Sequence, residues 1–182
     1  MKKDIFKIIR TRPFSEVRLI KLFPFRLLTK NRHGKAFTLI ELLLAVAIIG
    51  TLIAVGVPIY SNALNKARIN QAISKIALMG QKIDDFLVDN GRLPTNLSEI
   101  GEPNPHDPWG YPYHYLAILG KDKQDLEDKW RKDRFLIPLN TDYDLYSIGK
   151  DGDTNAPLTA NVSHDDIVRA NNGGYVGVAY KY

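Results

Sequence analysis

Five oxygen-donor side chains near the carboxyl end of the sequence are the residues best suited to chemistry. Asp151, Asp153 and Asn155 occupy alternate positions, and the adjacent pair Asp165 and Asp166 follows them. Carboxylate and amide oxygens are the ligands that a hard cation such as Ca²⁺ prefers. A loop that folds back on itself could bring the pair to Asp151, with backbone carbonyls completing the site. A solvated acidic turn is the alternative, because aspartates beside glycine are common in loops.

Familiar motifs for metal binding and catalysis are absent from the sequence. An EF-hand is excluded, because Ala156 occupies the position of its sharp-turn glycine and Val162 that of its bidentate glutamate. His106, His114 and His164 lack the spacing of metal ligands, so we expect them to pack against aromatic rings or to face solvent. There is no Gly-x-Ser-x-Gly, no phosphate-binding loop and no His-Glu-x-x-His.

The carboxylate of Glu41 lies inside an apolar segment, where a charged group is energetically costly. Residues 37–59 form an apolar run in which Glu41 is the only ionisable side chain. At about 1.5 Å per residue, a helix of this length crosses a hydrocarbon layer about 30 Å thick. A carboxylate just inside it costs several kcal/mol unless a positive group neutralises it. A plain signal anchor does not provide that group, whereas cleavage just before Phe37 exposes a new α-amino group close to Glu41.

The net charge of +5 is unevenly distributed along the chain. Residues 1–36 contain eleven Lys or Arg side chains against Asp4 and Glu16, which leaves 14 basic and 18 acidic residues beyond them. The basic side of an apolar segment stays in the cytoplasm, so the positive net charge of the chain reflects membrane targeting by residues 1–36. The acidic remainder argues against nucleic-acid binding. The absence of cysteine excludes disulfides, a thiol nucleophile and Cys-ligated zinc.

The start of the apolar run resembles a known processing motif. Residues 35–43, KAFTLIELL, resemble the prepilin cleavage and methylation motif that type IV pilins and type II secretion pseudopilins share. The resemblance implies that a prepilin peptidase cuts between Ala36 and Phe37 and N-methylates Phe37. It also implies that Glu41 pairs with the amino terminus of a neighbouring subunit during assembly. Pro58 stands where the family's membrane helix commonly has a proline, and Ala36 replaces the family's usual glycine.

A second resemblance narrows the family. Residues 107–115, DPWGYPYHY, resemble a signature of the type II secretion major pseudopilin, the G-type subunit, although an aromatic mini-core under a loop is the alternative. Major pseudopilins hold one Ca²⁺ in a carboxyl-terminal loop. The resemblance therefore implies calcium as a cofactor, with Asp151, Asp165 and Asp166 as side-chain ligands and the carbonyl of Ile148 as an additional ligand.

The spacing of apolar residues predicts the long helix that positions Glu41 and Pro58. The helical pattern extends from the apolar run to about residue 90, where Asn90-Gly91 ends it. Its second half carries apolar residues spaced alternately four and three apart, namely Ile69, Ile73, Ile76, Gly80, Ile83 and Leu87. Pro58 marks the region that we expect to bend or melt locally. The charged stretch of residues 121–134 is interpreted as an exposed insertion without a site.

The predicted fold class is α+β, with a long amino-terminal helix packed on a small antiparallel β-sheet and a carboxyl-terminal calcium loop. Four segments are predicted. Residues 1–36 are a cytoplasmic leader that is cleaved, and residues 37–59 are the half of the helix that spans the membrane or lies in the filament core. Residues 60–90 are the amphipathic half of the helix, and residues 91–182 are a periplasmic β-domain.

The function implied by the resemblance is structural, and the chain is not expected to be an enzyme. Copies of it would assemble with other pseudopilins into a periplasmic pseudopilus that drives the export of folded proteins. Its expected partners are prepilin peptidase, the inner-membrane secretion platform and the membrane, which it spans once. The alternative is a type IV pilus subunit for motility, adhesion or DNA uptake. A distant alternative is a membrane-tethered periplasmic hydrolase in which His164 acts with Asp165 or Asp166.

Overall fold

A long helix is the first element of the computed structural model, which describes residues 36–126 and 129–182. The helix α1 comprises the 52 residues Leu39–Asn90 and includes Pro58 within its length. The predicted helix is therefore confirmed, while local softening at Pro58 stays a prediction. The predicted leader, apart from Ala36, lies outside the described residues. Residues 44–182 form one compact unit.

The end of α1 follows its local sequence. Gly91 has a φ of +66°, and its N–H donates to the carbonyl of Leu87 at 2.9 Å. A left-handed residue in this position is a common helix stop, and glycine adopts it without strain. The short 3₁₀ helix Leu97–Ile100 follows, with Asn96 as its N-cap, because the Asn96 side chain accepts a hydrogen bond from the N–H of Ser98. The predicted helix end is confirmed.

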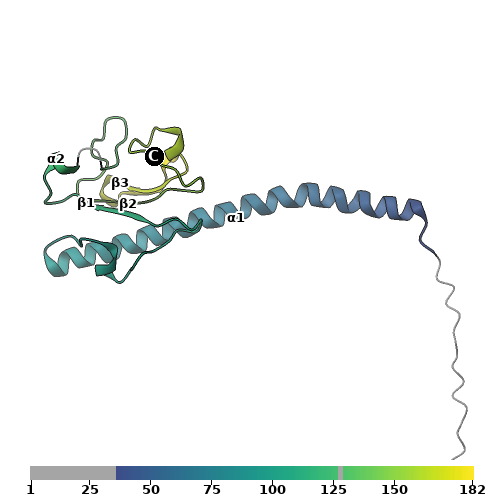
Figure 1. The fold of residues 1–182 in the computed structure, drawn as a ribbon, viewed down its shortest axis with the longest axis horizontal. Helices are drawn as coiled ribbons and strands as arrows, with labels where there is room; N and C mark the ends of the chain where they lie inside the picture. Colours follow the sequence, from purple (N-terminus) through teal and green to yellow (C-terminus); the bar gives the residue numbers. More distant parts are fainter. Residues whose placement is uncertain (1–35, 127–128) are drawn as a thin grey trace, which may run out of the picture. The chain divides into compact units, whose positions relative to one another are not determined.

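Four short strands form one antiparallel sheet in the order β1-β2-β3-β4 (Figure 1). The strands are β1 (His114–Ala117), β2 (Tyr143–Ser147), β3 (Ile167–Ala170) and β4 (Tyr175–Val178). The single-turn helix α2 (Lys123–Leu126) lies between β1 and β2 in the chain. Three-residue 3₁₀ turns occupy Asn161–Ser163, Asn171–Gly173 and Ala179–Lys181. The predicted small antiparallel sheet is confirmed.

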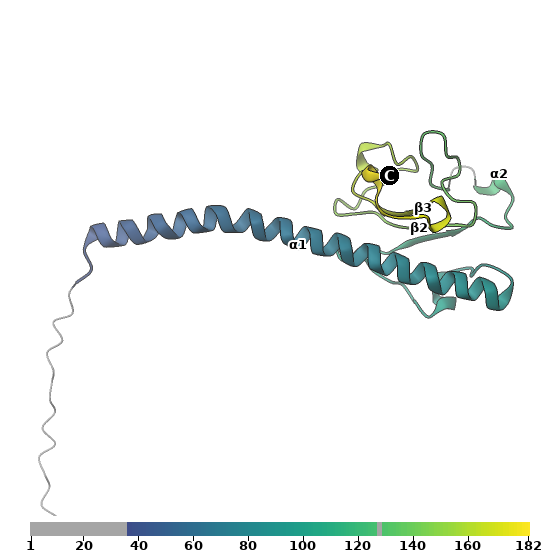
Figure 2. The same ribbon diagram turned by 180° about the vertical axis from the view of Figure 1, so that it is seen from behind.

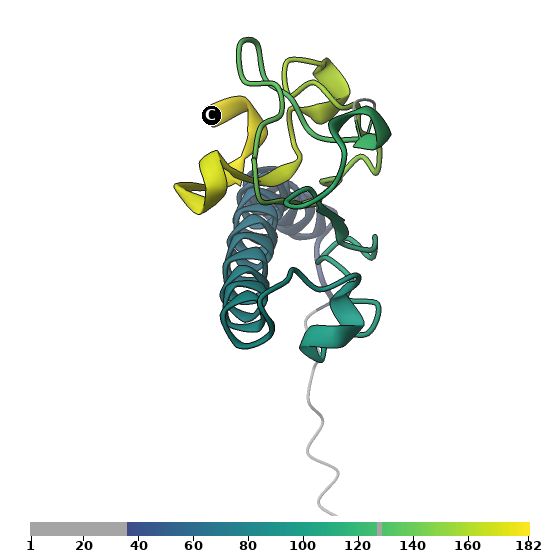
Figure 3. The same cartoon turned by 90° about the vertical axis from the view of Figure 1, so that its left-hand side faces the viewer.

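The main core lies between the second half of α1 and one face of the sheet (Figures 1 and 2). Ile76, Met79 and Ile83 of the helix are fully buried. Viewed along the helix, the sheet covers one side of α1 (Figure 3). The residues that the strands contribute to this core are Tyr143, Leu145, Ile167 and Val178. The apolar stripe predicted from the sequence is therefore the buried face of the helix.

The opposite face of the sheet is covered by the long connections rather than by a helix. Because side chains alternate along a strand, Val168 and Ala170 face away from α1, where they pack with Leu139, Leu158 and Ala179. A third cluster joins Ile118, Leu126 and Trp130. The interpretation of residues 121–134 as an exposed insertion is wrong for Leu126, Trp130 and Arg131, which are 5%, 5% and 2% exposed. The many charged residues around Trp130 and Arg131 made the whole stretch resemble a solvent-exposed one in the sequence.

Candidate functional site

The carboxylate of Glu41 is held at the first turn of α1. Its Oε2 accepts hydrogen bonds from the N–H of Thr38 at 2.9 Å and from Thr38 Oγ1 at 2.7 Å, and the Glu41 N–H donates back to Thr38 Oγ1 at 3.3 Å. This reciprocal pattern is a capping box, which satisfies backbone donors that a helix start leaves unpaired. Within a single subunit, Thr38 is therefore the polar partner of Glu41. The Thr-x-x-Glu spacing could have indicated this in the sequence.

The first half of α1 exposes a continuous apolar surface. Residues 36–64 are all exposed, and Gly50 and Gly56 have no neighbour near the position where a side chain would begin. Among the described residues, α1 is the one helix long and apolar enough to cross a membrane, and none of its apolar window is buried. An uncovered apolar surface of this length is stable only in a membrane or against other subunits.

Asp107 organises the aromatic signature. It is 5% exposed, and its Oδ1 accepts hydrogen bonds from the N–H groups of Trp109 at 3.0 Å and Tyr111 at 2.9 Å. Its Oδ2 accepts from the hydroxyl of Ser147, at the end of β2, at 2.6 Å. One carboxylate thus shapes the turn and ties it to the sheet. Sequence reasoning identified the segment but missed this role.

Replacing Asp107 with alanine should destabilise the domain by at least about 2 kcal/mol, because three donors lose an ionised acceptor in a buried position. Urea unfolding of the full chain in detergent, followed by tryptophan fluorescence, measures the change. Asp153→Ala is the matched control, because Asp153 is exposed. Equal midpoints for both variants would contradict the assigned role of Asp107.

Asp151 and Asp165 do lie together in the acidic loop. Asp165 Oδ2 accepts hydrogen bonds from the N–H groups of Lys150 at 2.7 Å and Asp151 at 3.1 Å. Asp151 Oδ1 accepts from the N–H of Asp153 at 3.0 Å. Gly149 has a φ of +73°, and a Cβ there would approach Asp165 to 2.6 Å. These carboxylates therefore hold the backbone of the loop in place.

Asp166 is fully buried and binds other partners than that pair does. Its Oδ2 accepts hydrogen bonds from Arg131 Nη2 at 2.5 Å and from Thr154 Oγ1 at 2.6 Å. Burial raises the pKa of Asp166 to about 6, whereas the hydrogen bond from Thr154 and the charge of Arg131 act to lower it.

The predicted calcium ligands do not converge on one point. Across residues 36–126 and 129–182, no group of three or more His, Cys, Asp or Glu side chains is placed to hold a metal ion. One carboxylate oxygen each of Asp151, Asp165 and Asp166 already accepts a hydrogen bond from a protein donor. The donor set therefore does not fit a closed metal site, and calcium binding stays a prediction.

The three histidines beyond the leader have no catalytic arrangement. His114 stacks on Tyr146 with ring centroids 5.0 Å apart, and burial, followed by the charge of Arg131, lowers the pKa of His114. His106 and His164 are exposed. The predicted aromatic packing or exposure of the histidines is confirmed. The two carboxylates next to His164 contact other groups, so the hydrolase alternative lacks an oriented acid–base pair.

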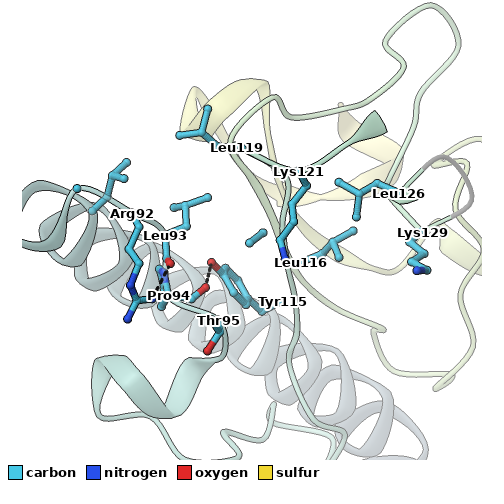
Figure 4. A pocket seen from close by; sticks show the side chains of 14 residues that line it. Arg92, Leu93, Pro94, Thr95, Tyr115, Leu116, Leu119, Lys121, Leu126 and Lys129 are labelled. Atoms are coloured by element: carbon cyan, nitrogen blue, oxygen red, sulfur yellow. Dashed lines mark hydrogen bonds between the residues drawn. The ribbon is translucent and has the colours of Figure 1, made fainter. Parts of the chain in front are cut away.

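A groove of about 680 Å³ lies between the segment that follows α1 and the edge strand β1 (Figure 4). The hydroxyl of Tyr115 donates to the carbonyl of Pro94 at 2.9 Å across it. Arg92, Lys121 and Lys129 supply its charges, and none of the described residues that line it is Asp, Glu or His. The groove therefore offers an apolar, basic surface without a carboxylate or an imidazole among the described residues that line it.

Comparisons with known proteins agree with the two resemblances. The prokaryotic N-terminal methylation motif matches residues 31–57, and the sequence profile of type II secretion system protein G matches residues 60–165. The type II secretion system core protein G of Pseudomonas aeruginosa is 28% identical over 144 residues, covering 68% of this chain and 88% of that protein. The corresponding core protein G of Dickeya chrysanthemi is 28% identical over 130 residues, covering 67% and 81%.

Pilins are also similar, over a shorter length. The type IV major pilin of Neisseria gonorrhoeae is 36% identical over 77 residues, which is 41% of this chain and 46% of the pilin. No solved structure matches the chain.

Proposed function

Because this chain belongs to the type II secretion system protein G family, we propose that it is the structural subunit of a pseudopilus that drives the export of folded proteins. The observation that carries the proposal is the exposed apolar half of α1, joined to a small domain of this family. Such a subunit needs no catalytic site. Its apolar half-helix is held first by the membrane and then by the same half-helices of neighbouring copies and of other pseudopilins.

Processing and orientation follow from the segment before α1. A prepilin peptidase would cut between Ala36 and Phe37 and methylate the new amino group of Phe37, as the match to the methylation motif over residues 31–57 supports. The basic leader stays in the cytoplasm, and one crossing then places residues 91–182 in the periplasm. The inner-membrane secretion platform is the site at which subunits leave the bilayer.

A type IV pilus subunit is the second candidate, favoured by the higher identity to the gonococcal pilin. That match covers 41% of the chain, whereas the protein G profile covers residues 60–165 and so includes the aromatic signature, all of β2 and the acidic loop as far as Asp165. The two candidates share processing and filament assembly and differ in the system that they serve.

Deletion of the gene in its own bacterium should abolish the release of folded enzymes into the medium and leave surface fibres and motility unchanged. Complementation should restore release, and mass spectrometry of the mature subunit should find N-methylated Phe37 at its start. Normal export together with lost motility would instead assign the chain to a type IV pilus. An intact leader on the assembled subunit would contradict the proposed processing.

A further inference from the structure

Arg131 binds the acidic loop in its middle and at its end. Its side chain is 3% exposed. Nη2 donates to Asp166 Oδ2 at 2.5 Å, and Nη1 donates to Thr154 Oγ1 at 2.5 Å and to the carbonyl of Asn155 at 2.7 Å. One guanidinium therefore joins the middle of the loop to the residue that precedes β3.

The sheet fixes Arg131 from the other side. Its N–H donates to Asp144 Oδ2 on β2 at 2.6 Å, and Asn140 donates to the other oxygen of the same carboxylate at 2.8 Å. The guanidinium carbon lies 4.5 Å from the ring centroid of Tyr146, a distance at which a cation is attracted to an aromatic face. The position of this cation is thus set by β2 as well as by the loop.

We propose that Arg131 closes the loop of residues 148–166 in place of a metal ion, so that this subunit folds without calcium. A guanidinium is always charged and presents several donors in a fixed plane, which matches a carboxylate, a hydroxyl and a carbonyl at once. A divalent cation bound to Asp166 would lie within a few ångströms of that guanidinium, and two like charges at such a distance in a buried site repel strongly.

The remaining oxygens of the predicted set do not replace Asp166. Asp151 and Asp165 hold backbone N–H groups of their own loop. Asp166 Oδ1 is the one oxygen of these three carboxylates that is both buried and without a hydrogen-bond partner among the described residues, whereas Ca²⁺ takes about six to eight oxygen ligands. Arg131 Nε is also buried and unpaired, so the two unpaired atoms belong to the same ion pair.

Arg131 belongs to the charged stretch of residues 121–134, which the sequence alone predicts to be an exposed insertion without a site. Together with the neighbouring Trp130, which packs on Ile118 and Leu126, Arg131 gives this stretch a structural role. This stretch supplies the cation, and the acidic loop supplies the acceptors.

Thermal unfolding of the full chain in detergent tests the proposal, with circular dichroism recorded in millimolar CaCl₂ and in EGTA. The wild-type Tm should be the same in both, because a ligand that does not bind the folded state does not stabilise it. Titration calorimetry should show no calcium binding. Arg131→Met should lower the Tm by at least about 10 °C in both buffers, since removing one partner leaves a buried carboxylate unpaired.

Arg134→Met is the matched control, because Arg134 is exposed in the same segment, and it should leave the Tm unchanged. A wild-type Tm that rises in calcium, or a saturable calcium isotherm, would overturn the proposal. So would an Arg131→Met protein as stable as the wild type. If Arg131→Met does not fold, the wild-type comparison in calcium and EGTA still decides the question, and it is independent of whether the subunit serves a pseudopilus or a pilus.

Discussion

Glu41→Gln should give a subunit that is cleaved and inserted but that forms at least about tenfold fewer filaments, since a loss of about 1.4 kcal/mol per contact already lowers an association constant tenfold. Glutamine retains the size of the side chain and its ability to cap the helix through Thr38. It lacks the negative charge that a neighbouring amino terminus needs inside the membrane. Electron microscopy of sheared filaments measures assembly, and mass spectrometry measures cleavage.

Thr38→Val is the control that separates capping from charge pairing. It removes the hydroxyl that bonds to Glu41 Oε2 at 2.7 Å and leaves the carboxylate available to a neighbouring subunit. We expect filaments to form in this variant. Normal assembly of Glu41→Gln would refute the pairing mechanism while leaving the family assignment intact. Loss of assembly in both variants would show that the capping box itself is required.

Ile76→Ala should destabilise the folded domain by about 2–5 kcal/mol, because it removes fully buried methyl and methylene groups and leaves a cavity. Ile76 is 0% exposed and lies in the core between α1 and the sheet. Urea unfolding of the full chain in detergent measures the loss, with Trp109 and Trp130 as fluorescent probes.

Ile53→Ala is the matched substitution in the other half of the same helix. Ile53 is 57% exposed within the subunit, so its truncation should leave the unfolding midpoint of the domain unchanged. Its effect should appear in filament yield, because the side chain packs only after assembly. An equal loss of domain stability in the two variants would contradict the division of α1 into an assembly half and a core half.

Local patterns explain why the helix was predictable. The apolar run of residues 37–59 and the stripe that includes Ile76 and Ile83 follow from the helical repeat alone, and Gly91 ends the helix by its own backbone preference. The carboxyl-terminal β-domain was less defined. Its strands are four or five residues long, and their pairing depends on partners that periodicity does not specify.

The functional residues also fall into two groups, those that a local motif identifies and those whose role depends on a distant partner. Phe37 and Glu41 were identified from a short contiguous motif, and even the missed capping by Thr38 depends on residues three positions apart. The role of Asp107 depends on Ser147, forty positions away in the chain. The acidic loop was recognised as a place for a cation, but the residue that supplies positive charge there was assigned to an exposed insertion.

Side chains that are neighbours along the chain were enough to predict the helix, its membrane-length apolar half, the processing motif and the family. Tertiary structure alone decided that Asp166 pairs with Arg131, which lies thirty-five positions earlier. Periodicity reports which residues share a helix or strand face, but it does not report which charge on one connection meets which charge on another. That choice is made when the connections fold over the outer face of the sheet, where a buried carboxylate must find a partner.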